Sequence, residues 1–308
     1  MRRERPRNKE RETPHMDPVG VIGLGLMGSV LVSRLRSAGF PVMAHDVDPA
    51  KRAAAEAGGA VLALPAAMAA ACGCIVLALF DTAQVEEVVE QSLMPAAGGG
   101  RPIILCTSTC DPDAIAALSD RLAASGLRFL EAPISGTSEQ VRQGDGVALI
   151  GGDPEHLEAA APVLRALFAT SHHVGRCGDG NRGKLAINLV LGLNRLALAE
   201  GMAFAERLGM NPAAFLTVAR QSAAYSQVMD TKGAKMANGD FAPQGRARQT
   251  LKDARLILDL AARHGQDLPL EEVNAAILDA CVAAGDGDLD NSVVFRELRR
   301  RRAGPVSL

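Results

Sequence analysis

The segment from Pro18 to Asp46 constrains the fold more than any other part of the chain. An apolar run at residues 19–22 leads directly into the turn Gly23-Leu24-Gly25-Leu26-Met27-Gly28. A helical pattern then covers residues 25–38, and a second apolar run at 41–45 ends at Asp46. Strand, glycine turn, helix, strand and acid, in this order, are the context in which Gly-x-Gly-x-x-Gly indicates a dinucleotide-binding βαβ unit.

Each glycine of this turn has its own mechanical reason. Gly23 allows the tight turn, Gly25 lets the backbone approach a pyrophosphate, and Gly28 lets the helix pack closely on the strand. The N-terminus of the following helix offers free N–H groups and a partial positive charge to the phosphates. The whole turn, residues 23–28, is therefore predicted to bind the cofactor.

Asp46 predicts which nicotinamide cofactor is preferred. A carboxylate at the end of the second strand accepts hydrogen bonds from the ribose hydroxyls of NAD. The 2′-phosphate of NADP would oppose it, at a cost of about 4 kcal/mol for like charges ~4 Å apart in an effective dielectric near 20. NAD is favoured, while Lys51 and Arg52 nearby leave NADP possible.

The totals exclude several classes of protein. At 308 residues the chain suits two domains, and a net charge of −2 gives no reason to expect a nucleic acid or an anionic membrane as partner. The six cysteines form no paired zinc spacing. No signal-peptide pattern is visible, which favours reduced, mostly buried thiols in a cytoplasmic protein. The most apolar long stretch, residues 185–205, is interrupted by polar and charged side chains, so we expect no membrane span.

Hydrophobic periodicity divides the chain into three parts. Residues 1–16 carry mixed charges and predict a disordered arm. From 17 to 177, strands alternate with helices, which indicates a Rossmann-type, doubly wound, mostly parallel sheet covered on both faces. The predicted strands are 19–23, 41–45, 60–62, 73–79, 102–106, 127–132, 146–151 and 172–174, and the predicted helices are 25–38, 49–57, 65–70, 82–91, 111–125 and 154–168.

From 178 to 308 no further strand pattern is found, so an all-α domain is expected there. Its first helix, 183–208, would be about 39 Å long at 1.5 Å per residue. It is apolar nearly all round and must therefore be buried on every side, which predicts packing against a partner subunit in a homodimer or homotetramer. The other predicted helices are 212–221, 226–236, 248–264, 270–284 and 292–301.

Four sequence blocks appear in order along residues 18–300, and together they resemble the β-hydroxyacid dehydrogenase family. This family includes 3-hydroxyisobutyrate dehydrogenases and tartronate semialdehyde reductases. The blocks are the glycine turn, Glu131-Ala132-Pro133-Ile134-Ser135-Gly136, Gly178-x-Gly180-x-x-x-Lys184-Leu185-x-x-Asn188, and Leu251-Lys252-Asp253. The resemblance implies an NAD(P)-dependent enzyme that moves a hydride between nicotinamide and a small β-hydroxy acid, or its semialdehyde or keto form.

Lys184 and Asn188 carry the predicted chemistry. They are four residues apart and so project from one face of a helix. A protonated lysine can donate to a carbonyl oxygen during reduction, and burial that lowers its pKa towards ~7–8 lets it act as the base during oxidation. The resemblance gives Lys184 the catalytic role and Asn188 a substrate-binding role. An ordinary exposed lysine is the alternative.

The remaining predicted site residues follow from the resemblance. Ser135, Gly136 and Thr137 would bind a substrate carboxylate, and Thr109 would lie near the nicotinamide ribose unless it only caps a helix. Leu79 and Phe80 would contact the cofactor through their backbone, or serve only as core residues. Lys252 would close over the nicotinamide from the second domain, with an ion pair to Asp253 as the alternative.

The chain departs from the family pattern at three positions. Cys106 stands where many members have Asp, and Thr137 and Gln140 stand where they have Gly. A cysteine at a strand end is usually a small core residue, whereas Thr137 narrows the pocket. These departures leave the substrate open.

Two patterns resemble metal sites, but no metal is expected. Asp286, Asp288, Asp290 and Glu297 imitate a calcium loop, but Asn291 lies in the segment where such a loop needs Gly. His172 and His173 are adjacent on a strand and point to opposite faces.

Three rival functions remain. A non-catalytic NAD sensor or assembly protein shares the fold, and so does an imine reductase, which commonly lacks the lysine. A 6-phosphogluconate dehydrogenase would need a histidine close after the lysine, and residues 185–192 contain none.

Overall fold

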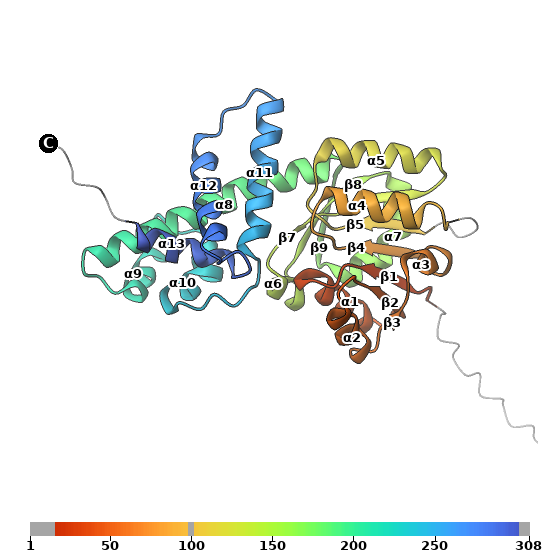
Figure 1. Cartoon of the computed structure of the whole chain (residues 1–308), viewed down its shortest axis with the longest axis horizontal. Helices are drawn as coiled ribbons and strands as arrows, with labels where there is room; N and C mark the ends of the chain where they lie inside the picture. Colours follow the sequence, from red (N-terminus) through yellow and green to blue (C-terminus); the bar gives the residue numbers. More distant parts are fainter. Residues whose placement is uncertain (1–15, 98–101, 302–308) are drawn as a thin grey trace, which may run out of the picture.

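The computed structural model describes residues 16–97 and 102–301. The predicted arm at residues 1–16 lies outside the described residues except for Met16. Three consecutive glycines at 98–100, a sequence typical of a turn, also lie outside them. Within the described ranges the chain forms a sheet domain followed by a group of helices (Figure 1).

The sheet has nine strands in the order β3-β2-β1-β4-β5-β6-β8-β7, with β9 beside β8. The six strands from β3 to β6 are parallel, whereas β8 runs antiparallel to both β6 and β7. This confirms a doubly wound, mostly parallel sheet. The strands are β1 Val19–Ile22, β2 Val42–His45, β3 Val61–Leu62, β4 Cys74–Leu77, β5 Ile103–Cys106, β6 Arg128–Glu131, β7 Ile134–Ser135, β8 Val147–Gly152 and β9 Thr170–Gly175.

Helices cover both faces of this sheet (Figure 1). Alternate residues of each central strand enter two different cores, as the period of two requires: Val76 of β4 faces one core, and Ile75 and Leu77 face the other. Helices α1, α6 and α7 close the first core and α3, α4 and α5 the second. Their bounds are α1 Leu26–Ser37, α2 Pro49–Ala57, α3 Pro65–Ala71, α4 Thr82–Val88 with a π-helical turn Val89–Leu93, α5 Pro112–Ala124, α6 Ser138–Gln143 and α7 Pro154–Leu167.

Two short elements, β7 and α6, were not predicted from the sequence. β7 has only two residues, and α6 has six residues with little apolar periodicity. Both depend on pairing with β8 and packing on α1, which lie far away in the sequence. Elements of this kind owe their stability to tertiary contacts rather than to local propensity.

The second half is helical, as predicted. β9 ends at Gly175 and α8 begins at Asp179, on either side of the predicted domain boundary. The described helices after β9 enclose a third core of their own. They are α8 Asp179–Arg207, α9 Pro212–Ala219, a π-helical turn Met229–Gly233, α10 Ala234–Asn238, α11 Ala247–Arg263, α12 Pro269–Ala283, a 3-10 turn Asn291–Val293 and α13 Val294–Arg300.

Helix α8 runs from the sheet domain through the helical half (Figure 1). Its expected burial on every side is not met within a single chain, because Val190 and Phe204 are 60% and 64% exposed. By length and composition alone α8 would suffice to cross a membrane, which the sequence analysis did not expect. Core helices of soluble proteins meet the same test of length and composition.

Candidate active site

A cavity of about 980 Å³ lies where the carboxyl ends of the parallel strands face α8, α11 and α12. Ligands of open α/β sheets bind at this edge. Every predicted site residue lines the cavity except Leu24, Gly28 and Lys252. Those that do are Gly23, Gly25, Leu26, Met27, Asp46, Leu79, Phe80, Thr109, Ser135, Gly136, Thr137, Lys184 and Asn188.

The glycine turn has the geometry that a pyrophosphate requires. Gly23 has φ +91°, and a Cβ on Gly28 would overlap the carbonyl oxygen of Gly23. A Cβ on Gly25, by contrast, would meet nothing within 4 Å, and Gly25 precedes the first turn of α1 without any side-chain cap. The free N–H groups of α1 and the open space at Gly25 therefore fit a nucleotide phosphate.

Asp46 lies at the end of β2, 7% exposed, and its carboxylate holds the turn in place. It accepts hydrogen bonds from the backbone N–H of Leu24 at 2.7 Å and of Asp48 at 2.9 Å, and Lys51 Nζ lies 3.4 Å away. Burial alone would raise the pKa of Asp46, but these hydrogen bonds and Lys51 outweigh it and hold the pKa below its ordinary value. Asp46 is thus an anion in the lining of the cavity, and Leu24 contacts it through its backbone N–H.

The segment after β6 forms a polar corner of the cavity. Gly136 has φ +136°, a conformation that L side chains rarely adopt. Thr137 caps α6: its hydroxyl accepts from Gln140 N at 3.2 Å, and Gln140 Oε1 accepts from Thr137 N at 2.9 Å. The two residues that depart from the family's glycines therefore form one reciprocal capping box.

Lys184 lies in the first part of α8 with its side chain 6% exposed. Burial lowers its pKa to about 8, although the carboxylate of Asp253 acts in the opposite direction. Asn188, one turn further, donates from Nδ2 to Asp253 Oδ2 at 3.0 Å. The alternative of an ordinary exposed lysine is therefore wrong, because the amine is buried in the cavity and burial lowers its pKa.

Asp253 also lines the cavity, whereas the sequence suggested it only as a possible partner of Lys252. The two side chains form an ion pair at 2.8 Å, and Lys252 Nζ also donates to the carbonyl oxygen of Thr109 at 2.5 Å. Lys252 thus joins α11 to the loop after β5, while Asp253 contacts Asn188 on α8. The Leu251-Lys252-Asp253 block contained this acid, but nothing local in the sequence indicated its contact with Asn188.

The N-terminus of α8 is anchored by a buried acid. Glu131, fully buried at the end of β6, accepts from Gly180 N at 2.7 Å, Asn181 N at 3.2 Å and Asn181 Nδ2 at 2.5 Å. A carboxylate here satisfies free N–H groups and the positive end of the helix. It thereby fixes the part of α8 that carries Lys184.

Leu79 and Phe80 make contacts through their backbone, and Cys106 is buried. Leu79 N donates to Ser108 Oγ at 2.8 Å, and Phe80 O accepts from Gln249 across to α11 at 3.3 Å. Cys106 is fully buried, as expected of a core thiol, and all six cysteines are free and buried. Hydrogen bonding to the Cys110 thiol, together with burial, raises the pKa of Cys106 well above its ordinary value.

The acidic series that imitates a calcium loop is neutralised by basic side chains. Asp290 pairs with Lys232 at 2.8 Å, and the other three carboxylates pair with arginines. These pairs are Asp286 with Arg296 and Arg300, Asp288 with Arg246 and Arg248, and Glu297 with Arg300 and Arg301. Among the described residues no group of three or more acids, histidines and cysteines is placed to hold a metal.

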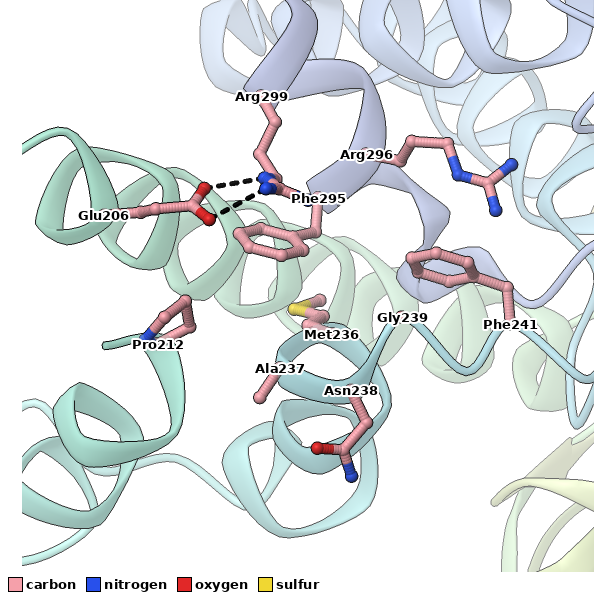
Figure 2. A pocket seen from close by; sticks show the side chains of 10 residues that line it. All are labelled: Glu206, Pro212, Met236, Ala237, Asn238, Gly239, Phe241, Phe295, Arg296 and Arg299. Carbon is pink, nitrogen blue, oxygen red and sulfur yellow. Dashed lines mark hydrogen bonds and ion pairs between the residues drawn. The ribbon is translucent and has the colours of Figure 1, made fainter. Parts of the chain in front are cut away.

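A second, smaller cavity of about 390 Å³ lies among α8, α9, α10 and α13 (Figure 2). Glu206 and Arg299 form an ion pair at its rim, and the Arg296 guanidinium stacks over the Phe241 ring at 4.6 Å (Figure 2). None of the predicted site residues lines it.

The main cavity also contains residues that the sequence analysis did not place in the site. Arg195 of α8 and Glu271 and Asn274 of α12 line its far end and are all at most 4% exposed. The available signal was Arg195 itself, a charge within the most apolar long stretch of the chain.

Comparisons with known proteins agree with this architecture. Residues 18–175 match the family described as the NAD binding domain of 6-phosphogluconate dehydrogenase. Residues 178–298 match the family described as NAD-binding of NADP-dependent 3-hydroxyisobutyrate dehydrogenase.

Individual relatives span nearly the whole chain. L-threonate dehydrogenase of Cupriavidus necator is 32% identical over 90% of this chain and 95% of its own length. The crystal structure of a 3-hydroxyisobutyrate dehydrogenase from Salmonella typhimurium has a TM-score of 0.83 at 26% identity, covering 91% of this chain and 99% of that one. An imine reductase from Pseudomonas sp., at 20% identity and a TM-score of 0.61 over 92% of this chain and 99% of its own, shows likeness of fold alone.

Proposed function

The chain belongs to the β-hydroxyacid dehydrogenase family, and we propose that it uses Lys184 to move the proton of the reaction. It is an NAD(P)-dependent oxidoreductase that acts on the CH–OH group of a small β-hydroxy acid, or in reverse on its semialdehyde or keto form. The observation that carries the role of Lys184 is its buried amine, with a pKa of about 8, in the cavity that also contains the glycine turn.

Different residues of the chain would bind the cofactor, bind the substrate and transfer the proton. The nicotinamide cofactor, when bound, supplies the hydride acceptor or donor. The glycine turn and Asp46 would hold it, and Ser135 with the backbone around Gly136 would bind the substrate carboxylate. In oxidation, neutral Lys184 takes the hydroxyl proton as the carbonyl forms, and in reduction its ammonium returns that proton to the oxygen.

Two side chains support Lys184 in this role. Asn188 is oriented by Asp253, which leaves its side-chain oxygen for a substrate hydroxyl or for the Lys184 ammonium. Glu131 fixes the first turn of α8.

The presence of Lys184 argues against an imine reductase. A non-catalytic NAD sensor would need no buried amine beside the cofactor.

An assay of cofactor consumption tests this function. We expect NADH to be oxidised with at least one member of a panel of small semialdehydes and β-keto acids. We also expect kcat/KM to be at least ~10-fold higher with NADH than with NADPH, because a like charge against Asp46 costs up to about 4 kcal/mol. NADH binding by fluorescence without turnover on any compound would favour the sensor, and a preference for NADPH would contradict the role given to Asp46.

We further propose that residues 17–177 form the cofactor domain and 178–308 the substrate and dimerisation domain. The exposed apolar side chains of α8, among them Val190 and Phe204, support a homodimer or homotetramer. Light scattering on the purified protein should give a mass of two or four chains, and a monomer at micromolar concentration would contradict this. Six free, buried thiols favour the cytoplasm.

A further inference from the structure

One face of α8 continues past the lysine site. Lys184, Asn188, Leu191, Gly192 and Arg195 all line the same cavity, at spacings that keep them on one side of a helix. At 1.5 Å per residue, Gly192 lies about 12 Å and Arg195 about 16 Å beyond Lys184 along the axis. The cavity is therefore longer than a small acid beside Lys184 would require.

Arg195 carries a buried charge with two unpaired nitrogens. It is 4% exposed, and neither Nε nor Nη2 has a hydrogen-bond partner in the part of the chain that the structure describes. Its Nη2 lies 3.6 Å from where a Cβ of Gly192 would stand, so the side chain is directed back along α8 towards the lysine site. Desolvating a guanidinium without a counter-ion is unfavourable, and a site of this kind calls for an anion.

The acids around Arg195 are held by other side chains. Both carboxylate oxygens of Glu271 accept hydrogen bonds from Asn274 Nδ2, at 3.2 and 3.1 Å. Asp290 accepts from Lys232 Nζ at 2.9 and 2.8 Å. Burial lowers the pKa of Arg195, and the charges of Asp290, Glu271 and Asp253 act in the opposite direction. None of these acids forms an ion pair with Arg195 among the described residues, so its guanidinium can donate to a ligand carboxylate.

The neighbouring atoms define the rest of this subsite. Asn274 Oδ1 is buried without a partner among the described residues and can accept from a hydroxyl. Gly192 lets the Asn274 side chain pack close to α8, since a Cβ there would lie 3.1 Å from Asn274 Nδ2. Two unpaired guanidinium nitrogens and one unpaired amide oxygen are a donor–acceptor set that matches a carboxylate with a nearby hydroxyl.

We propose that Arg195, with Asn274 beside it, binds a second carboxylate of the substrate at the far end of the cavity. The substrate is accordingly a β-hydroxy dicarboxylic acid, or its keto form, with a carbon chain longer than three or four atoms. This inference rests on the proposed function, because it takes the reacting carbon to lie at Lys184.

A matched pair of substrates tests this. 3-Hydroxyadipate and 3-hydroxyhexanoate have the same six-carbon chain and differ in the terminal carboxylate. We expect kcat/KM to favour 3-hydroxyadipate, and Arg195→Leu to lower kcat/KM for it by roughly 10- to 100-fold, as loss of a charge-assisted hydrogen bond does. The same variant should change kcat/KM for 3-hydroxyhexanoate by less than about threefold, since that acid makes no such bond.

Variants of Arg195 distinguish a role in substrate binding from a role in protein stability. Arg195→Leu removes an unpaired buried charge, so its Tm should equal or exceed that of the wild type. Arg195→Lys should retain part of the preference for 3-hydroxyadipate that Arg195→Leu loses. Arg207→Leu changes an exposed arginine of the same helix and should leave that preference unchanged. A lowered Tm with an unchanged substrate preference would show that Arg195 is a structural partner of Glu271 and would overturn the proposal.

Binding gives a readout that needs no turnover. Adipate, titrated calorimetrically into the protein with NAD present, should bind the wild type at least ~10-fold more tightly than Arg195→Leu. Equal affinities would overturn the subsite and leave the dehydrogenase function intact. Failure to consume cofactor with any hydroxy acid would instead overturn the proposed function.

Discussion

Replacing Lys184 with alanine is expected to lower kcat by at least ~100-fold, the low end for loss of a general acid–base group. The amine is buried in the cavity that Ser135 and Asn188 also line, with a pKa that burial lowers to about 8. Alanine cannot take its proton, whereas the glycine turn that would hold NADH remains unchanged. Stopped-flow turnover and NADH fluorescence titration measure the two quantities on the same sample.

A control for this variant lies on the same helix. Glu200→Ala changes an exposed side chain of α8 and should keep kcat within about twofold of the wild type, as surface substitutions generally do. Turnover of the Lys184→Ala variant close to the wild-type value would contradict the role of Lys184 as the general acid and base. Loss of NADH binding together with turnover would mean that Lys184 holds the cofactor instead.

The pH dependence of the wild type gives a second readout of the same group. Because burial lowers the pKa of Lys184 to about 8, the neutral amine predominates only above that pH. Oxidation needs the neutral form, so its kcat/KM should rise with pH and level off above about 8. Reduction needs the ammonium, so its kcat/KM should fall above the same pH. Profiles that are flat between about pH 6.5 and 9.5 in both directions would contradict this role.

Gly28→Ala is expected to destabilise the protein by about 3 kcal/mol or more. Its methyl group would overlap the carbonyl oxygen of Gly23, and backbone on both sides of the turn leaves no flexible side chain to move aside. Urea unfolding measures the change in free energy. If Gly28→Ala is as stable as the wild type, the glycine turn can shift to admit the methyl group, which would contradict the close packing of Gly28 on Gly23.

Gly25→Ala makes the same chemical change at another glycine of the same turn, and its expected effect is different. The added methyl would meet nothing within 4 Å, so stability should stay within about 0.5 kcal/mol. The methyl would occupy space where the phosphates approach, so NADH affinity should fall at least ~10-fold. Unchanged NADH affinity would place the pyrophosphate elsewhere.

The first βαβ unit was predictable because its signals are local. Gly23, Gly25 and Gly28 lie within six residues, and the flanking apolar runs have strand and helix periods that need no distant partner. The same holds for the spacing of Lys184 and Asn188 on α8. By contrast, β7 and α6 are too short to carry a period, and Thr137 and Gln140 look like simple departures until the capping box that joins them is seen.

The order of the blocks along the sequence determined the family, the parallel sheet with its helical second half, and the chemical type of each site residue. Only the tertiary structure decided which of these side chains meet. Asp253 contacts Asn188 across 65 residues of chain, and Lys252 reaches Thr109 across 143. Arg195 becomes a candidate substrate-binding residue only because α12 helps to bury it without forming an ion pair with it among the described residues. Such pairings depend on how helices pack, and no local pattern encodes the distance between two residues that are remote in sequence.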